Sequence, residues 1–354
     1  MIARLQASHR LRSVNRSPLM RELRLHGRGG QGTVIASKLL ADKGEQITLW
    51  CHGADTCRDL REKRESSTYL PGVTLPPQVQ VTAALEEGVA GKSLLLCVVP
   101  SHALREVMAQ TVSRVAPETT IVCGTKGLEE ESLKTAGEVL ADIFGAERTG
   151  RHAFLSGPSF AAEAARGLPT AVTVAAHAEE VAAVVQQTLS TQSFRVYTSK
   201  DVIGVQLGGV VKNVIAIAAG ISDGLGVGQN ARGALITRGL AEMTRLAVRM
   251  GADAITLAGL PGLGDLILTC AGDLSRNRKV GLQIAQGKNL QEITSGTRTV
   301  AEGVRNARSV HSLALRLGVE MPIVEQMDQV LYQGKKPAEA VRDLMQRSLK
   351  AEVR

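Results

Sequence analysis

Hydrophobic positions in the first half of the chain form short runs, separated by stretches with helical spacing. The runs typical of strands are RELRLH (21–26), EQITLW (45–50), KSLLLCVVP (92–100), TTIVCG (119–124), HAFLSG (152–157), AVTVAA (171–176) and FRVYTS (194–199). Stretches such as GTVIASKLLADKG and HALREVMAQTVSRV between them have the spacing of helices. This alternation predicts a doubly wound, Rossmann-type α/β domain, in which helices cover both faces of a parallel sheet. We expect the last two runs to extend that sheet.

The pattern changes near residue 199. From there on it shows long helical stretches with glycine turns and no convincing strand. A chain of 354 residues also exceeds the usual size of a single core. We therefore predict a basic extension over 1–20, an α/β domain over 21–198 and an all-α domain over 199–354.

One helical stretch is unusually apolar. Residues 202–222 read VIGVQLGGVVKNVIAIAAGIS, and Lys212 is the only charge among them. The run is long enough to test as a membrane span, but Gln206, Lys212 and Asn213 in its middle would be costly in lipid. We predict a buried helix of the helical domain and no membrane span.

Charge and aromatic content argue against nucleic acid as a partner. The formal net charge is +8. The acid-free residues 1–19 hold four arginines, which supply +4 of it: Arg4, Arg10, Arg12 and Arg16. Aromatic residues make up only 2% of the chain, too few for base-stacking platforms. The extension has the composition of a transit peptide, but we favour a disordered extension or a start codon assigned too early.

Cysteine and histidine spacing indicates neither a disulfide scaffold nor a metal site. The five cysteines are scattered and include no C-x-x-C pair, and no two of the seven histidines stand four residues apart. This usage is typical of a protein of the reducing cytoplasm, and no metal is expected.

A glycine-rich loop predicts dinucleotide binding. The segment GRGGQG (27–32) fits G-x-G-x-x-G and lies between a predicted strand and a predicted helix. Glycines there allow close approach of a pyrophosphate, and the helix N-terminus offers N–H groups to it. The predicted cofactor residues are Gly27, Gly29, Gly30, Gln31 and Gly32. A plain tight turn is the alternative.

The end of the second strand bears on which cofactor is used. NAD-binding folds place an acidic residue there for the ribose 2′-hydroxyl, but this chain reads Trp50-Cys51-His52-Gly53. Asp55 comes slightly late, whereas His52 and Arg58 suit a 2′-phosphate. We predict that NADP(H) is accepted, and the candidate cofactors are NADP(H) and NAD(H).

The helical half contains candidates for proton transfer and phosphate binding. Lys212 is either a solvated, snorkelling lysine or a buried one, whose lowered pKa would suit general acid–base catalysis. Asp265 stands where it either caps a helix or partners Lys212. Residues 275–278 (SRNR) read as a helix start at which arginines oppose the helix dipole, unless an anion binds there. A basic surface turn is the alternative. Together these features predict a dehydrogenase of a small phosphorylated alcohol or ketone.

Several longer motifs now reveal a resemblance. They are VVPSH, TKGLE, SGPSFAAEAARGLPTAV, VKNVIAIAAGISDGLGVGQNARGALITRGLAEM, GLGDLILTC, SRNRKVG, AEGVRNARSV and GVEMPIVEQMDQVLY. From about Leu23 to Glu352 the chain resembles bacterial NAD(P)-dependent glycerol-3-phosphate dehydrogenases. The resemblance implies reversible reduction of dihydroxyacetone phosphate to sn-glycerol 3-phosphate for phospholipid synthesis, in a cytoplasmic homodimer. It also implies a helical domain of the 6-phosphogluconate dehydrogenase-like superfamily.

The resemblance also assigns roles to individual residues. It makes Lys212 the catalytic proton acceptor, oriented by Asp265, with Asn213 and Thr269 as polar neighbours. The implied substrate contacts are Lys126, Gly157, Ser159, Lys212, Asp265, Ser275, Arg276 and Asn277. The implied cofactor contacts outside the glycine loop are Lys126, Ala161, Arg276, Val300 and Glu302. His52, at the end of the second predicted strand, is a further candidate.

One departure from the family lies in the glycine loop. The family has a serine and an aromatic residue where this chain has Gly30 and Gln31, and alanine where it has Arg28. We expect a weakened but working cofactor site. The rival interpretations are a related two-domain dehydrogenase of another hydroxy acid or phosphorylated ketone, and a cofactor-binding homologue without catalysis.

Overall fold

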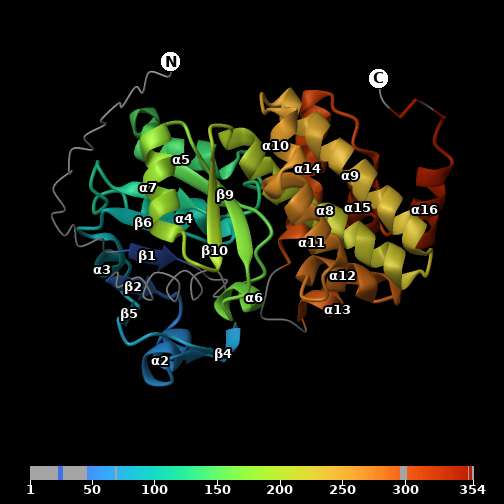
Figure 1. Cartoon of the computed structure of the whole chain (residues 1–354). Helices are drawn as coiled ribbons and strands as arrows, with labels where there is room; N and C mark the ends of the chain where they lie inside the picture. The colour runs from blue at the N-terminus through green and yellow to red at the C-terminus, as the bar shows by residue number, and fades with distance from the viewer. Residues whose placement is uncertain (1–22, 27–45, 68–69, 296–300, 350, 353–354) are drawn as a thin grey trace, which may run out of the picture.

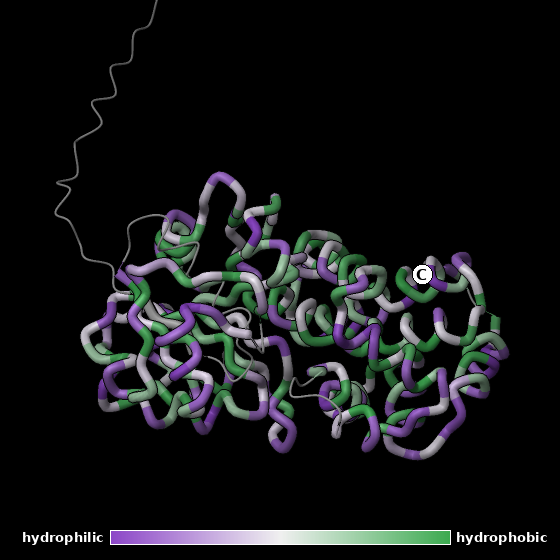
Figure 2. Tube along the Cα trace, turned by 90° about the horizontal axis from the view of Figure 1, so that it is seen from below, coloured by the Kyte–Doolittle hydropathy of each residue, from purple (hydrophilic) through white to green (hydrophobic). Residues whose placement is uncertain are grey.

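The computed structural model describes residues 23–26 (backbone), 46–67, 70–295, 301–349 and 351–352. The glycine loop, the helix expected after it, the extension over 1–20 and Val300 lie outside the described residues. Figures 1 and 2 show two halves side by side, an α/β half and a helical half.

The first half is built on an eight-stranded sheet in the order β10-β9-β8-β7-β6-β1-β2-β5. Its strands are β1 (Leu23–His26), β2 (Ile47–Trp50), β5 (Val79–Thr82), β6 (Leu94–Cys97), β7 (Thr120–Cys123), β8 (His152–Ser156), β9 (Thr170–Ala176) and β10 (Phe194–Ser199). A separate hairpin pairs β3 (Glu65–Ser66) with β4 (Leu70–Thr74). The predicted Rossmann-type fold is confirmed, although the sequence patterns did not reveal β3, β4 or β5.

The sheet is parallel as predicted, apart from one antiparallel pair of strands. β9 runs antiparallel to β8, and β10 is parallel to β9. Parallel neighbours need a crossover that traverses the length of the sheet. The only helix between β8 and β9 is α6 (Ala161–Ala165), and its five residues are too few for that return.

Helices cover both faces of the sheet. Among the described residues, those of the first half are α2 (Ala54–Glu62), α3 (Leu85–Val89), α4 (Leu104–Ala109), α5 (Ala136–Phe144), α6 and α7 (Glu179–Leu189), with 3₁₀ turns at Ser101–Ala103 and Ala146–Arg151. Alternate residues of β6 point into different cores: Leu94 and Leu96 join one cluster, and Leu95 joins the other. This two-residue alternation places an apolar layer on each side of the sheet.

Between residues 201 and 349 the described residues form helices and turns without strands. The helices are α8 (Val202–Gly224), α9 (Gln229–Arg249), α10 (Ala254–Ala258), α11 (Asp265–Ala271), α12 (Arg276–Ala285), α13 (Leu290–Ser295), α14 (Glu302–Leu317), α15 (Pro322–Tyr332) and α16 (Pro337–Met345), with a π-helical turn at Leu260–Gly264. Hydrophobic and hydrophilic residues alternate along several outer helices in Figure 2, as expected when one face of a helix is buried.

The central element of the helical half is α8. By length and composition it is the one helix among the described residues that would reach across a membrane, but 94% of its most apolar window is buried inside the protein. Asp201 caps its N-terminus by accepting from the Gly204 N–H at 2.8 Å. Its later turns pack tightly against α12, because Gly220 and Gly281 leave no side chains between the helices: a Cβ on Gly220 would lie 2.1 Å from the Arg278 carbonyl oxygen.

One feature contradicts the expectation drawn from cysteine spacing. Cys51, just after β2, and Cys57, within α2, form a disulfide across six residues. The remaining cysteines of the chain, Cys97, Cys123 and Cys270, are free and buried. The spacing alone did not suggest a bond, because the two sulfurs meet only once α2 folds back over the end of β2.

Candidate active site

Lys212 lies in the middle of α8, with 7% of its surface exposed. Its Nζ donates hydrogen bonds to Asp265 Oδ1 at 2.5 Å and to Thr269 Oγ1 at 2.9 Å. The solvated alternative for Lys212 is therefore wrong. The charge is tolerated within an apolar helix because it is paired and hydrogen-bonded.

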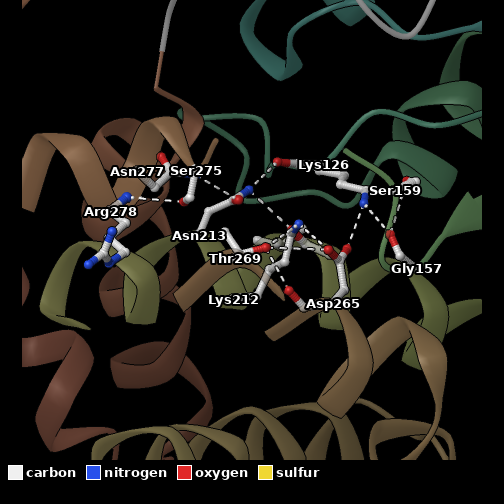
Figure 3. Close-up of polar contacts among 12 residues, drawn as sticks. Lys126, Gly157, Ser159, Lys212, Asn213, Asp265, Thr269, Ser275, Asn277 and Arg278 are labelled. Atoms are coloured by element: carbon white, nitrogen blue, oxygen red, sulfur yellow. Dashed lines mark hydrogen bonds and ion pairs between the residues drawn. The ribbon is translucent and has the colours of Figure 1, made fainter. Parts of the chain in front are cut away.

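Asp265 is the first residue of α11, directly after the π-helical turn. Lys126, which follows β7, donates from its Nζ to Asp265 Oδ2 at 2.6 Å. One buried carboxylate thus lies between two ammonium groups, as Figure 3 shows. Asp265 is neither an N-cap nor a partner of Lys212 alone.

Burial and mutual charge tune this cluster. Burial lowers the pKa of Lys212 to about 8, and Lys126 adds to the fall while Asp265 opposes it. Burial alone would raise the pKa of Asp265, but the two lysines hold it below its ordinary value. A lysine with a pKa near neutrality exchanges protons readily, and a carboxylate that stays ionised keeps it oriented.

The main chain at Lys126 is held from the helical half. Its carbonyl oxygen accepts from Asn213 Nδ2 at 3.3 Å and from Asn306 Nδ2 at 3.2 Å. The Lys126 side chain is held as well: its Nζ donates to the Gly157 carbonyl at 3.3 Å. Ser159 Oγ donates to the same carbonyl at 3.1 Å. The structure thereby brings Lys126, Gly157 and Ser159 of the first half onto the lysine–carboxylate cluster.

Glycine is required at position 157. Its φ of +140° lies in the region that favours glycine, and a Cβ there would approach the Val172 Cα to 2.9 Å. The turn after β8 thereby directs its carbonyl at Lys126.

A chain of amides leads from the cluster to the start of α12. Asn277 Nδ2 donates to Asn213 Oδ1 at 2.9 Å, and Asn277 Oδ1 accepts from the Gly303 N–H at 3.0 Å. Ser275 Oγ accepts from the Arg278 N–H at 3.2 Å and so caps α12, as predicted. The Asn277 side chain is therefore engaged within the protein, as Figure 3 shows.

The two arginines at this helix start differ. Arg278 is ion-paired with Asp223 at 2.8 Å and with Asp273 at 3.0 Å. The Arg276 side chain is exposed and makes no hydrogen bond or ion pair within the described residues. Desolvation lowers its pKa, and the nearby Glu302 carboxylate opposes that fall. Only Arg276 thus offers its guanidinium to an anion.

The strand order indicates where a dinucleotide would bind. β1 pairs with β2 on one side and β6 on the other, so the crevice at the carboxyl ends of β1 and β6 is the topological switch point. The glycine loop follows β1 directly. Beside the loop after β6, Ser101 Oγ donates to Glu302 Oε2 at 2.9 Å, which joins the first turn of α14 to the sheet half.

The described residues at this crevice fit a dinucleotide cofactor, because the unpaired Arg276 suits phosphate and Glu302 is held within reach of the switch point. Burial raises the pKa of Glu302, opposed by the Ser101 hydroxyl. The sequence candidate His52 lies exposed after β2, edge-on to Trp50. Ala161 begins α6 and packs against the sheet core.

One contact of the site was not foreseen from the sequence. Asn306 has no catalytic signature and acts by holding the Lys126 main chain, whereas Ser101 belongs to the VVPSH motif that follows a predicted strand. A signal for Asn306 does exist, since it is a polar residue on the mainly apolar buried stripe of α14, which includes Val304, Ala307 and Val310.

Comparison with known proteins gives a consistent result along the chain. Residues 24–182 match the family described as the N-terminus of NAD-dependent glycerol-3-phosphate dehydrogenase, and residues 201–342 match its C-terminus. A curated relative from Citrifermentans bemidjiense, named glycerol-3-phosphate dehydrogenase [NAD(P)+], is 54% identical over 92% of this chain and 97% of its own.

Solved structures support the same placement. A glycerol-3-phosphate dehydrogenase from Coxiella burnetii superposes with a TM-score of 0.88 at 39% identity, covering 92% of this chain and 99% of that one. A D-mandelate dehydrogenase reaches a TM-score of 0.58 at 12% identity over 90% of this chain and 99% of its own, which shows a shared fold alone.

Proposed function

This chain belongs to the NAD-dependent glycerol-3-phosphate dehydrogenase family, and from that premise we propose that it reversibly reduces dihydroxyacetone phosphate to sn-glycerol 3-phosphate with NAD(P)H. It is an NAD(P)-dependent oxidoreductase. The observation that carries the assignment of the site is the buried Lys212, paired with Asp265 where the two halves of the chain meet.

In this mechanism Lys212 is the acid–base group. During reduction its ammonium donates a proton to the oxygen on C2 of the substrate, and during oxidation the neutral amine takes that proton back. Asp265 orients the Nζ and stabilises its charged form. When bound in the crevice, a nicotinamide cofactor would supply the hydride chemistry at C2.

The remaining site residues position the substrate. Arg276, unpaired at the start of α12, binds the phosphate together with the N–H groups of that helix terminus, where Ser275 and Asn277 flank it. Lys126 holds the other side of Asp265 and, with Gly157 and Ser159, lines the substrate site. The cofactor would be held by the glycine loop, His52, Lys126, Ala161, Arg276, Val300 and Glu302.

The residues that follow β2 would bind the 2′-phosphate of NADPH. His52 follows β2 and Arg58 lies in α2, where they would contact that phosphate. Arg58 pairs there with Asp55 at 2.6 Å, but both side chains are exposed, so the pair is weak and opens readily. Acceptance of NADP(H) follows from this site, and NAD(H) is the second cofactor.

We further propose the finer features that the family resemblance implies. The domains divide near residues 198–199, just before α8 begins at Val202. The protein acts as a homodimer in the cytoplasm, and its product supplies glycerophospholipid synthesis. A light-scattering mass near 37.5 kDa, the mass of one chain, would contradict the dimer.

The test of the function is NADPH and NADH oxidation at 340 nm with dihydroxyacetone phosphate. We expect the wild type to turn over and Lys212→Ala to lose about a hundredfold or more in kcat, the scale of general acid–base catalysis. Lys279→Ala, at an exposed lysine of α12, is the control and keeps full activity. Absence of wild-type turnover with either cofactor would refute the proposal.

A further inference from the structure

Asn306 occupies an unusual place for a polar side chain. It lies within α14 and is 0% exposed. Its Nδ2 donates to two carbonyl oxygens from different parts of the chain, that of Lys126 at 3.2 Å and that of Val210 at 3.3 Å. An amide nitrogen has two N–H donors, so both are used.

The two acceptors belong to the site. Val210 lies on α8, two residues before Lys212, and Lys126 is the lysine that contacts Asp265 from the sheet half. Asn213 donates to the same Lys126 carbonyl but also belongs to α8. Asn306 is therefore a buried contact that ties a third element, α14, to the main chain of the loop after β7, beside the more exposed Arg305–Glu130 ion pair.

The loop is pressed closely against Asn306. A Cβ on Gly127 would lie 2.4 Å from Ser101 Oγ and 2.9 Å from Asn306 Oδ1. Asn306 Oδ1 has no hydrogen-bond partner among the described residues. The Asn306 amide therefore acts through its two N–H donors. The backbone of residues 126 and 127 has no room to shift toward it.

We propose that Asn306 is a positioning residue of the reaction: by holding the main chain of Lys126, it keeps the Lys126 ammonium on Asp265 and thereby sets the charge around Lys212. This inference rests on the proposed function. Asn306 itself touches neither substrate nor cofactor, and it acts through Lys126.

The arrangement predicts a signature beyond lost stability. The charged groups that face Lys212 are Asp265 from α11 and Lys126 from the loop after β7, and the nearby Cys270 thiol is neutral because burial raises its pKa to about 12. When Lys126 leaves Asp265, Lys212 loses a repulsive neighbour and no longer shares the carboxylate. Both changes raise the pKa of Lys212.

The first experiment compares Asn306→Leu, which keeps the size and removes the donors, with Ser309→Ala. Ser309 is a matched control because it is buried one turn further along α14 and its Oγ donates to the Arg305 carbonyl of the same helix. For Asn306→Leu we expect kcat/KM for dihydroxyacetone phosphate to fall about tenfold to a hundredfold, the scale of a slightly misplaced catalytic group. The inflection of its pH profile should move upward, whereas Ser309→Ala should leave the profile in place.

A double-mutant cycle separates positioning from folding. In a Lys126→Met background, Asn306→Leu should cause no further loss of kcat/KM and no further shift of the profile. Independent, multiplying losses would overturn the proposal. Gly127→Ala approaches the same contact from the loop and should give the same upward shift, which keeps the proposal testable if Asn306→Leu does not fold.

The outcomes distinguish the two levels of inference. If the wild type does not turn over dihydroxyacetone phosphate, the proposed function fails. If the wild type turns over and folded Asn306→Leu and Gly127→Ala keep the wild-type pH profile, the positioning role of Asn306 fails while the proposed function stands.

Discussion

At the scale of the residue, the main feature of the site is a cluster of buried charges. Two ammonium groups share one carboxylate, and that carboxylate is buried among them. Removing a buried partner is costly, because the remaining charge is left unpaired in a medium of low dielectric. The cluster therefore holds Lys212 in place, while burial, helped by Lys126 and opposed by Asp265, lowers its pKa to about 8, within the range useful for proton transfer.

The pH dependence of the reaction should follow the Lys212 pKa of about 8. Below it the ammonium form predominates, so reduction should be fast at low pH and its kcat/KM should fall above about pH 8. Oxidation needs the amine, so its kcat/KM should rise through the same region to a plateau. Steady-state rates in both directions between about pH 6 and about pH 10 check this, and two flat profiles would contradict it.

Arg276 should determine recognition of the phosphate. Arg276→Met should reduce kcat/KM for dihydroxyacetone phosphate by about tenfold to a hundredfold, the scale of a lost charge-assisted hydrogen bond. With dihydroxyacetone, which lacks the phosphate, the same variant should lose much less at saturating NADPH, because only the proposed cofactor contact of Arg276 is then removed. Lys279→Met, on the exposed side of α12, is the control. An equal loss with both substrates would favour a substrate without phosphate.

At the scale of the element, α8 connects the parts of the site. It carries Lys212 and Asn213, contacts the end of β8 through Gly209, and packs on α12 through its last turns. A helix that is apolar all round is typical of a buried core helix. Its glycines let neighbouring backbones approach, and that close approach places the start of α12 near Lys212.

The packing of α8 on α12 gives a test at this scale. A Cβ at Gly281 would lie 2.1 Å from the Ile217 carbonyl oxygen. We expect Gly281→Ala to lower the free energy of unfolding by about 1–3 kcal/mol through overpacking. Gly233→Ala, in α9 with open space around it, should raise that free energy by up to about 1 kcal/mol. Urea denaturation of both variants measures the difference, and equal effects would refute the account.

At the scale of the whole molecule, the two halves share a structural element. Val202 and Val205 in the first turn of α8 lie in the same cluster as Leu95 and Phe154 of the sheet, while the rest of α8 lies in the core of the helical half. Gln206 Oε1 also accepts from the Gly137 N–H of α5 at 2.8 Å. Neither half keeps its core intact when the other unfolds.

Thermal unfolding should therefore show one cooperative transition. Val205→Ala, at a residue with 0% exposure, should lower the midpoint of that single transition without dividing it. Differential scanning calorimetry checks this, through agreement of the calorimetric and van't Hoff enthalpies. Two resolved peaks in the wild type would show that the halves unfold independently.

Local pattern determined much of this protein. Strand runs such as LLLC of β6 and the helix cap at Ser275 were recognisable, because strand periodicity and capping depend on residues near one another in sequence. The unusual position of Lys212 was visible for the same reason, as one charge in an apolar run. The long family motifs indicated the activity.

Tertiary structure alone decided which groups meet. Asp265 lies 53 residues from Lys212 and 139 from Lys126 in the sequence. The periodicity of hydrophobic positions carries no information about contacts between residues so far apart. The direction of β9, the Cys51–Cys57 bond and the contact of Asn306 with Lys126 likewise depend on how separate elements pack. Sequence pattern records which face of an element is buried, whereas packing of the whole chain determines what that face touches.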